Sequence, residues 1–108
     1  MKNTFTILGC GSSLGSPWIT NYWGKCDKSN KKNLRTRCCA HFRYKNISTL
    51  IDTSPDLKIQ FKLNNIKNVD AVIYSHEHAD QTFGIFELRP FFWKNKKKID
   101  VYGSKKTI

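Results

Sequence analysis

Long apolar runs are missing from this sequence of 108 residues, and so is the apolar region of a secretory leader. A membrane-spanning helix needs ~20 predominantly apolar residues, and no stretch approaches that length. Residues 1–8 carry one lysine but lack the apolar region of about 7–15 residues that signal peptides contain. These absences predict a soluble protein of the cytoplasm with no membrane partner.

Cysteines at metal-finger spacing are missing as well. The chain has four cysteines, none of them in a C-x-x-C pair and two of them adjacent: Cys10, Cys26, Cys38 and Cys39. This arrangement suits neither a zinc ribbon nor a small disulfide framework. We expect reduced thiols in a reducing compartment.

Acidic residues are scarce, because 8 Asp and Glu accompany 19 Lys and Arg, giving a net charge of +11. Clustered basic side chains neutralise phosphates and release counterions, so one interpretation is a basic nucleic-acid-binding module. The densest segments are 28–37 and 94–98. A general richness in Lys, Asn and Ile, as AT-rich coding produces, explains the charge equally well without a binding role.

What the sequence does contain is typical of a globular protein, with 39% hydrophobic and 13% aromatic residues. A chain of this length is one domain or less, and it buries roughly two thirds of its unfolded surface on folding. One hydrophobic core is therefore expected.

Residue patterns predict a mixed α/β arrangement. β-Branched and aromatic runs bounded by turn residues indicate strands over 4–8, 37–44, 48–51, 69–75 and 99–103, with a hairpin turn at 45–46. Ser54 as N-cap and Pro55 at the first helical position indicate a helix that ends at 64–65. Its core-facing residues are predicted to be Leu57, Phe61 and Leu63. Apolar residues over 83–92 indicate a second helix, interrupted by Pro90.

A glycine-rich loop over 9–17 follows the first strand. Its glycines fall one position away from the dinucleotide-binding fingerprint, and no helix pattern follows them. Ser12 and Ser13 are candidate phosphate contacts through their hydroxyl and N–H groups. A simple flexible turn is the other interpretation.

The segment 75–81, Ser-His-Glu-His-Ala-Asp-Gln, carries the strongest candidate site residues. It follows an apolar strand, and alternate residues of an extended segment point the same way. His76 and His78 are therefore able to converge on one metal ion, with Asp80 nearby. Short His-x-His patterns also arise by chance, so a solvated loop remains the alternative. His41, alone in a strand, is more typical of a packed residue than of a ligand.

Four motifs together carry a resemblance to a known family. They are Leu8-Gly9-Cys10-Gly11-Ser12-Ser13, Ile51-Asp52-Thr53-Ser54-Pro55-Asp56-Leu57, Ser75-His76-Glu77-His78-Ala79-Asp80 and Gly84-Ile85-x-x-Leu88-Arg89. In order and spacing the chain resembles the metallo-β-lactamase superfamily, and most of all its cyclic-phosphodiesterase branch, which is similar to the ribonuclease Z group.

The resemblance implies a fold and its completeness. It implies the N-terminal half of an αββα sandwich, with one mixed sheet and helices on one face, so that residues 1–108 form a truncated domain. The uncovered face of this sheet, expected to include Ile7, Leu50, Val72 and Tyr74, would then need a partner. The expected partner is a second copy in a homodimer or a separately encoded C-terminal half.

The resemblance also implies site roles. His76 and His78 match the histidines of a first metal site, and Asp80 matches the carboxylate of a second, where it positions the catalytic hydroxide. Asp52 matches an aspartate that orients a metal ligand. The implied cofactor is zinc or manganese, and the implied substrate is a phosphodiester or a nucleic acid.

The chain departs from that pattern at two points. Gln81 stands where the motif has its last histidine, and an amide oxygen is a weaker zinc ligand than imidazole nitrogen. The remaining ligands of the family lie in the second half of a longer domain, so partial or weak metal occupancy is expected. Cys26 stands alone in the long loop, so the structural zinc of some relatives is not expected.

Three functions stay open at this point. The first is a metal-dependent hydrolase, most like a phosphodiesterase, that is incomplete and weakly active or inactive as an isolated chain. The second is a catalytically dead remnant of a split gene, and the third is the basic nucleic-acid-binding module.

Overall fold

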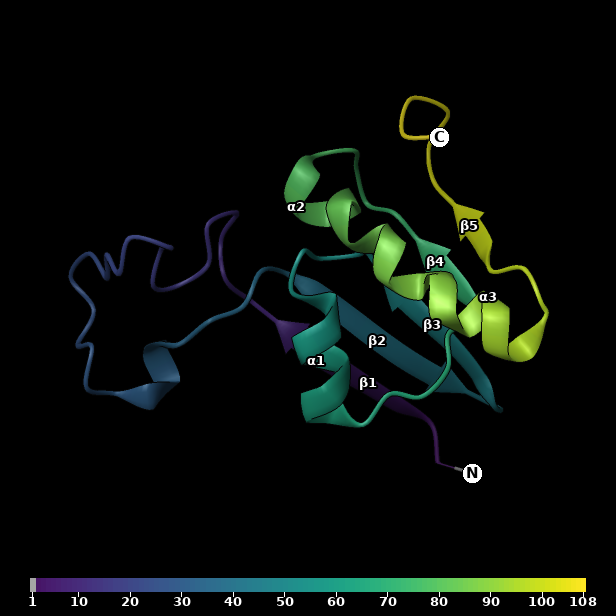
Figure 1. The fold of residues 1–108 in the computed structure, drawn as a ribbon, viewed down its shortest axis with the longest axis horizontal. Helices are drawn as coiled ribbons and strands as arrows, with labels where there is room; N and C mark the ends of the chain where they lie inside the picture. The colour runs from purple at the N-terminus through teal and green to yellow at the C-terminus, as the bar shows by residue number, and fades with distance from the viewer. Residues whose placement is uncertain (1) are drawn as a thin grey trace.

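The computed structural model describes residues 2–108, which form one five-stranded sheet with helices on one of its faces (Figure 1). The strands lie side by side in chain order: β1 (Thr4–Gly9), β2 (Cys39–Tyr44), β3 (Ile47–Ile51), β4 (Ala71–Ile73) and β5 (Asp100–Tyr102). The helical elements are η1 (Lys31–Asn33), α1 (Leu57–Asn64), α2 (Ala79–Thr82), η2 (Phe83–Leu88) and α3 (Arg89–Asn95). This arrangement confirms the predicted mixed sheet with a helical layer.

The sheet changes direction at β3. Strands β1, β2 and β3 pair antiparallel, whereas β3, β4 and β5 pair parallel. The predicted hairpin turn joins β2 to β3, and its two residues, Lys45 and Asn46, both have positive φ. Two residues of positive φ match the right-handed twist of the flanking strands. Helix α1 then makes the crossover from β3 to β4.

The core lies between the sheet and the helical layer. Leu50 and Val72 of the central strands are fully buried, and they face Leu57 and Phe61 of α1 and Leu88 of η2. Each fully buried aliphatic or aromatic side chain contributes about 1.5–3 kcal/mol relative to exposure. This cluster of apolar side chains holds α1 and η2 against one face of the sheet.

The predicted uncovered face was wrong at three of its four residues. Leu50, Val72 and Tyr74 are buried, and only Ile7 is exposed. Because side chains alternate along a strand, the register pairs Ile7 with Ala40 and Ile51, not with Leu50. The open face carries a different set of exposed apolar side chains: Phe5, Ile7, Tyr44, Ile47, Ile73 and Tyr102.

The first helix begins later than predicted. Helix α1 starts at Leu57 with Asp56 as its N-cap, and Ser54 instead accepts a hydrogen bond from the Asp56 N–H and donates one to the Gln60 side chain. Leu57 and Phe61 face the core as predicted, whereas Leu63 is 78% exposed and was wrongly assigned. The predicted end is confirmed, because Asn65 caps the helix in the left-handed conformation.

Pro90 starts a helix and does not interrupt one. Residues Phe83–Leu88 form a 3-10 turn, and Pro90 occupies the first turn of α3, where its missing N–H has no helical partner to lose. Phe83, Phe86 and Phe92 are consequently exposed, while Leu88 points into the core.

The long connection between β1 and β2 extends away from the sheet, on the left of Figure 1. Its two ends are held together by bridges that pair Gly11 with Arg37 and Ser16 with Arg35. Arg37 also forms a two-pronged ion pair with Asp56 at 2.8 Å, and these hydrogen bonds hold the pKa of Asp56 below its ordinary value. Arg37 is thereby engaged within the fold. No helix among residues 2–108 combines the length and apolarity that crossing a membrane requires.

Candidate functional site

The predicted site loop lies where two parallel strands end. Strand β3 ends at Ile51 and is followed by Asp52, and strand β4 ends at Ile73 and is followed by the 75–81 segment. The carboxyl ends of parallel strands share one edge of a sheet, which is where open α/β sheets gather binding residues. The sheet therefore brings Asp52 next to the histidine loop.

Asp52 contacts this loop directly through Ser75. Its carboxylate is buried and accepts hydrogen bonds from the Ser75 N–H at 2.8 Å and from the Ser75 hydroxyl at 2.7 Å. The Asp52 backbone has a φ of 63°, a conformation that Asp and Asn tolerate better than most residues. This local strain turns the carboxylate toward Ser75.

Ser75 in turn contacts His76. Its hydroxyl oxygen lies 2.8 Å from Nδ1 of the imidazole. The single hydroxyl proton goes to Asp52, because a carboxylate only accepts, so Ser75 must accept a hydrogen bond from Nδ1–H. The neutral His76 ring therefore keeps its lone pair on Nε2. An imidazole held in this way by its other nitrogen is the usual state of a metal-ligating histidine.

His78 lies beside His76. The two ring centroids are 4.6 Å apart and the rings meet edge to face. His78 is exposed, directly before α2, and Glu77 between the two histidines pairs with Lys106 at 3.4 Å. A hydrogen bond from its own backbone N–H, together with Lys106, lowers the pKa of Glu77. The pair of histidines thus sits beside a carboxylate that points to the last residues of the chain.

Two neighbouring imidazoles have the chemistry to hold a divalent transition metal. They do not form a full ligand set, because no group of three or more His, Cys, Asp or Glu side chains comes together anywhere from residue 2 to residue 108. Zinc sites use four ligands, of which catalytic sites draw three from the protein. The residues present therefore fit part of a metal site.

Asp80 and Gln81 lie in the first turns of α2. The Gln81 side-chain amide donates to Asp80 at 3.0 Å, so it holds the carboxylate that follows the two histidines. Gln81 itself is 7% exposed, and its Oε1 atom is buried without a hydrogen-bond partner. A buried amide oxygen without a partner is costly, so the position retains an unused acceptor.

Thr53 fastens the two loops to each other, a role that sequence reasoning missed. Its N–H donates to the Gln81 carbonyl at 2.7 Å, and its hydroxyl lies 2.8 Å from the Tyr74 hydroxyl. Burial raises the pKa of Tyr74, which remains a neutral phenol in this contact. Ser75 was missed in the same way; its place directly before His76 was the available signal.

The other predicted residues lie apart from this site in their contacts. Ser12 and Ser13 are exposed on a turn closed by the hydrogen bond from Gly15 N–H to the Ser12 carbonyl. His41 is buried, and its Nε2 lies 2.7 Å from the Ser48 hydroxyl. The predicted packed role of His41 is confirmed. Cys26 is an exposed free thiol in the long loop.

Comparison with known proteins identifies the class to which this architecture belongs. A mixed five-stranded sheet with helices on one face is the half of a metallo-β-lactamase fold, and the solved structure of a new diphosphatase from the PhnP family superposes on 98% of this chain with a TM-score of 0.83 and 32% identity. Residues 48–108 match the Beta-lactamase superfamily domain. The chain belongs to the metallo-β-lactamase superfamily.

Two more distant structures share the fold alone. Zn²⁺-bound PqqB from Methylobacterium extorquens has a TM-score of 0.74 at 16% identity, and the metallo-β-lactamase fold protein YhfI from Bacillus subtilis has 0.64 at 20%. This chain covers 98% of its own length in both, and 38% and 39% of theirs.

The chain spans only part of every relative that it matches. It covers 43% of the PhnP-family diphosphatase. An octanoyltransferase from Porphyromonas gingivalis (strain ATCC BAA-308 / W83) is 31% identical over 105 residues, which is 94% of this chain but 20% of that protein. The shared segment is therefore a fraction of each whole protein.

Proposed function

We propose that this chain carries part of the active site of a metal-dependent hydrolase that acts on phosphodiester or related phosphate bonds. The single observation behind this proposal is the hydrogen-bonded series Asp52, Ser75 and His76, which presents His76 Nε2 next to His78. The 32% identity to a PhnP-family diphosphatase supports the phosphate-bond substrate class.

In this proposal His76 and His78 hold the metal ion, zinc or manganese, through their ring nitrogens. Such an ion supplies Lewis-acid polarisation of a phosphate oxygen and lowers the pKa of water. Asp52 and Ser75 orient His76 and fix its tautomer. Asp80, held by Gln81, positions the attacking water or a second ion. Ser12 and Ser13 offer hydroxyl donors to the substrate phosphate.

The same proposal treats residues 1–108 as one half of a sandwich domain. The exposed apolar residues on the open sheet face support a second layer that packs there, because exposed apolar patches of this kind mark contact surfaces. A second copy or a separate C-terminal half would also bring the metal ligands that the histidine pair lacks. By itself the chain is proposed to bind metal weakly and to have little or no activity.

Elemental analysis of the purified chain tests this proposal. We expect substoichiometric zinc or manganese in the wild type and its loss in a His76→Ala, His78→Ala double variant. Glu77→Gln is the matched control, because it changes the residue between the two histidines without removing an imidazole. Metal content that does not depend on the histidines would contradict the proposal. Hydrolysis of a chromogenic phosphodiester, compared with the double variant, then measures the activity of the isolated chain.

A further inference from the structure

Aromatic side chains crowd the outer surface of the helical layer. Phe83 and Phe86 of η2 are 71% and 67% exposed, and Trp93 of α3 is 57% exposed, with Phe92 beside it also exposed. Large aromatic rings dominate the energetics of interfaces, so a cluster of them in water indicates a contact surface. The core does not use these rings, since Leu88 and Phe91 provide the contacts to it.

Arg89 fixes two of these rings in place. Its guanidinium carbon lies 5.5 Å from the centre of the Phe86 ring and 5.8 Å from that of Trp93, within the range of a cation–π contact. Its Nε also donates to the Phe86 carbonyl at 2.9 Å. The rings are thus held around a cation while more than half of each side chain stays open to solvent. Holding the rings in advance lowers the entropy cost of binding.

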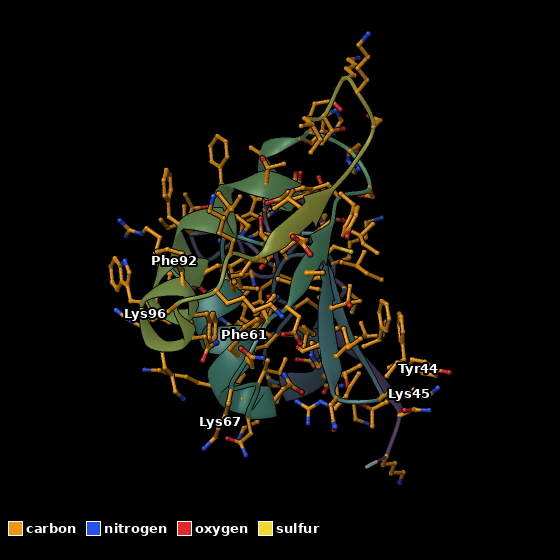
Figure 2. The ribbon with its side chains drawn as sticks, turned by 90° about the vertical axis from the view of Figure 1, so that its right-hand side faces the viewer. Tyr44, Lys45, Phe61, Lys67, Phe92 and Lys96 are labelled. Atoms are coloured by element: carbon orange, nitrogen blue, oxygen red, sulfur yellow. The ribbon has the colours of Figure 1, made fainter. Side chains whose placement is uncertain are left out.

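Lysines continue this surface toward β5. Lys94, Lys96, Lys97 and Lys98 are all exposed, and the turn into this segment is fixed by a hydrogen bond from the Lys96 N–H to the Phe92 carbonyl at 2.8 Å. Figure 2 shows Phe92 and Lys96 together on the outer side of the helices. A hollow of about 300 Å³ beside them is lined by both kinds of residue: Ile85, Leu88, Arg89, Phe92, Lys98, Ile99 and Val101.

This surface is separate from the open sheet face. In Figure 2 Phe92 and Lys96 lie on one side of the molecule, and Tyr44, which belongs to the open face, lies on the other. A second layer packed against the open face would leave the aromatic and basic residues uncovered. Any role of this surface is therefore independent of how the sandwich is completed.

We propose that the η2–α3 surface, made of Phe83, Phe86, Arg89, Phe92, Trp93 and segment 94–98, binds single-stranded nucleic acid. Unpaired bases stack on exposed rings and on guanidinium planes, and lysines along the same path neutralise the phosphates between them. Alternating rings and cations match the alternation of bases and phosphates in a single strand. The net charge of +11 adds long-range attraction for such a polyanion.

An anionic membrane is the rival partner for aromatic and basic residues, and the geometry favours it less. An interfacial helix separates an apolar face from a charged face. Here Arg89 lies over the rings of Phe86 and Trp93, so cation and rings share one patch. The elements are also short, six residues for η2 and seven for α3.

Fluorescence anisotropy with a labelled oligouridylate tests this inference on the full chain. We expect the single strand to bind more tightly than a duplex of equal length. Phe86→Ala and Trp93→Ala should each weaken binding about tenfold, because stacking of one base on a ring is of that order. Trp18→Ala is the matched control, since Trp18 is an exposed tryptophan of the long loop.

Charge reversal separates the basic residues in the same assay. A Lys94→Glu, Lys97→Glu, Lys98→Glu variant should reduce the slope of log affinity against log salt by about 2–3. The same change at Lys25, Lys28 and Lys32, in the long loop, should reduce it less. The His76→Ala, His78→Ala double variant should bind as the wild type does, because this surface does not contain the histidines.

Three results would overturn the inference. Equal affinity for duplex and single strand would reduce the surface to non-specific charge. Equal effects of Trp93→Ala and Trp18→Ala, with circular dichroism showing both variants folded, would remove the stacking role. Stronger binding to vesicles of phosphatidylserine and phosphatidylcholine than to the oligonucleotide, lost in Trp93→Ala, would assign the surface to a membrane.

Discussion

The Asp52 carboxylate accepts two hydrogen bonds from Ser75, at 2.8 Å from its N–H and 2.7 Å from its hydroxyl. This two-point contact joins the residue after β3 to the loop after β4. It also decides the tautomer of His76, since the hydroxyl proton is used on Asp52. The contact is therefore the structural basis of the proposed metal site.

Removing this contact should weaken metal binding without removing a ligand. Ser75→Ala deletes the group that orients His76, and loss of such a supporting hydrogen bond typically costs roughly 10–100-fold in metal affinity. Calorimetric titration with Zn²⁺ measures the change. Ser104→Ala is the matched control, because that serine contacts Thr107 near the end of the chain. Unchanged affinity in Ser75→Ala would show that His76 does not depend on Ser75.

Gly84→Ala should destabilise the fold. A Cβ at Gly84 would collide with the backbone carbonyl of Ser54, which is the segment that follows Asp52. Forcing extra atoms into a packed site costs about 1–3 kcal/mol, and backbone gives way less than a side chain. Urea unfolding measures the loss. Gly103→Ala, whose Cβ would meet the flexible end of the Ile108 side chain at 3.3 Å, should change stability much less.

The four thiols should differ in reactivity. Burial raises the pKa of Cys39 to about 12, and its Sγ contacts the Asp52 carbonyl at 3.4 Å, whereas the other three cysteines are exposed. Because the thiolate is the reactive form, a disulfide reagent should modify three thiols of the native chain, and Cys39 only after unfolding. Cys39→Ser should leave the native count unchanged, and Cys26→Ser should lower it by one. Four thiols reacting at one rate would contradict the buried position of Cys39.

Stability should fall in mild acid because of His41. Burial, and then the charge of Arg43, lowers the pKa of His41 below its ordinary value of 6.5. The unfolded chain then takes up a proton before the folded chain does, so the free energy of unfolding decreases as the pH falls below about 6.5, by at most ~1.4 kcal/mol per pH unit. Chemical unfolding at several pH values measures this slope. It should shrink in His41→Gln and persist in His78→Gln.

The open sheet face should drive self-association if a second copy provides the missing layer. Light scattering should then give a dimer mass for the wild type and a monomer mass for Ile7→Lys, which places a charge at the centre of that face. Ile59→Lys is the matched control, because Ile59 is equally exposed but lies on α1. A single monomer peak for the wild type at high concentration would rule the dimer out.

The sequence by itself determined the elements that depend on local signals. The strands, the turn at 45–46 and the end of α1 at Asn65 all follow from residues within a few positions of each other. The four motifs likewise identified the superfamily, because their order and spacing are properties of the chain. Local backbone preference and side-chain period are sufficient for such features.

Tertiary structure alone decided which surfaces are open and how the site residues meet. The predicted open face failed at Leu50 and Val72 because the strand register, set by partners far along the chain, turns these side chains under α1. Ser54 left its predicted capping role because Gln60 engages its hydroxyl. The contact from Asp52 to Ser75 exists only because parallel pairing of β3 with β4 brings together residues 23 positions apart. No local pattern encodes such distances, since they depend on the packing of the whole sheet.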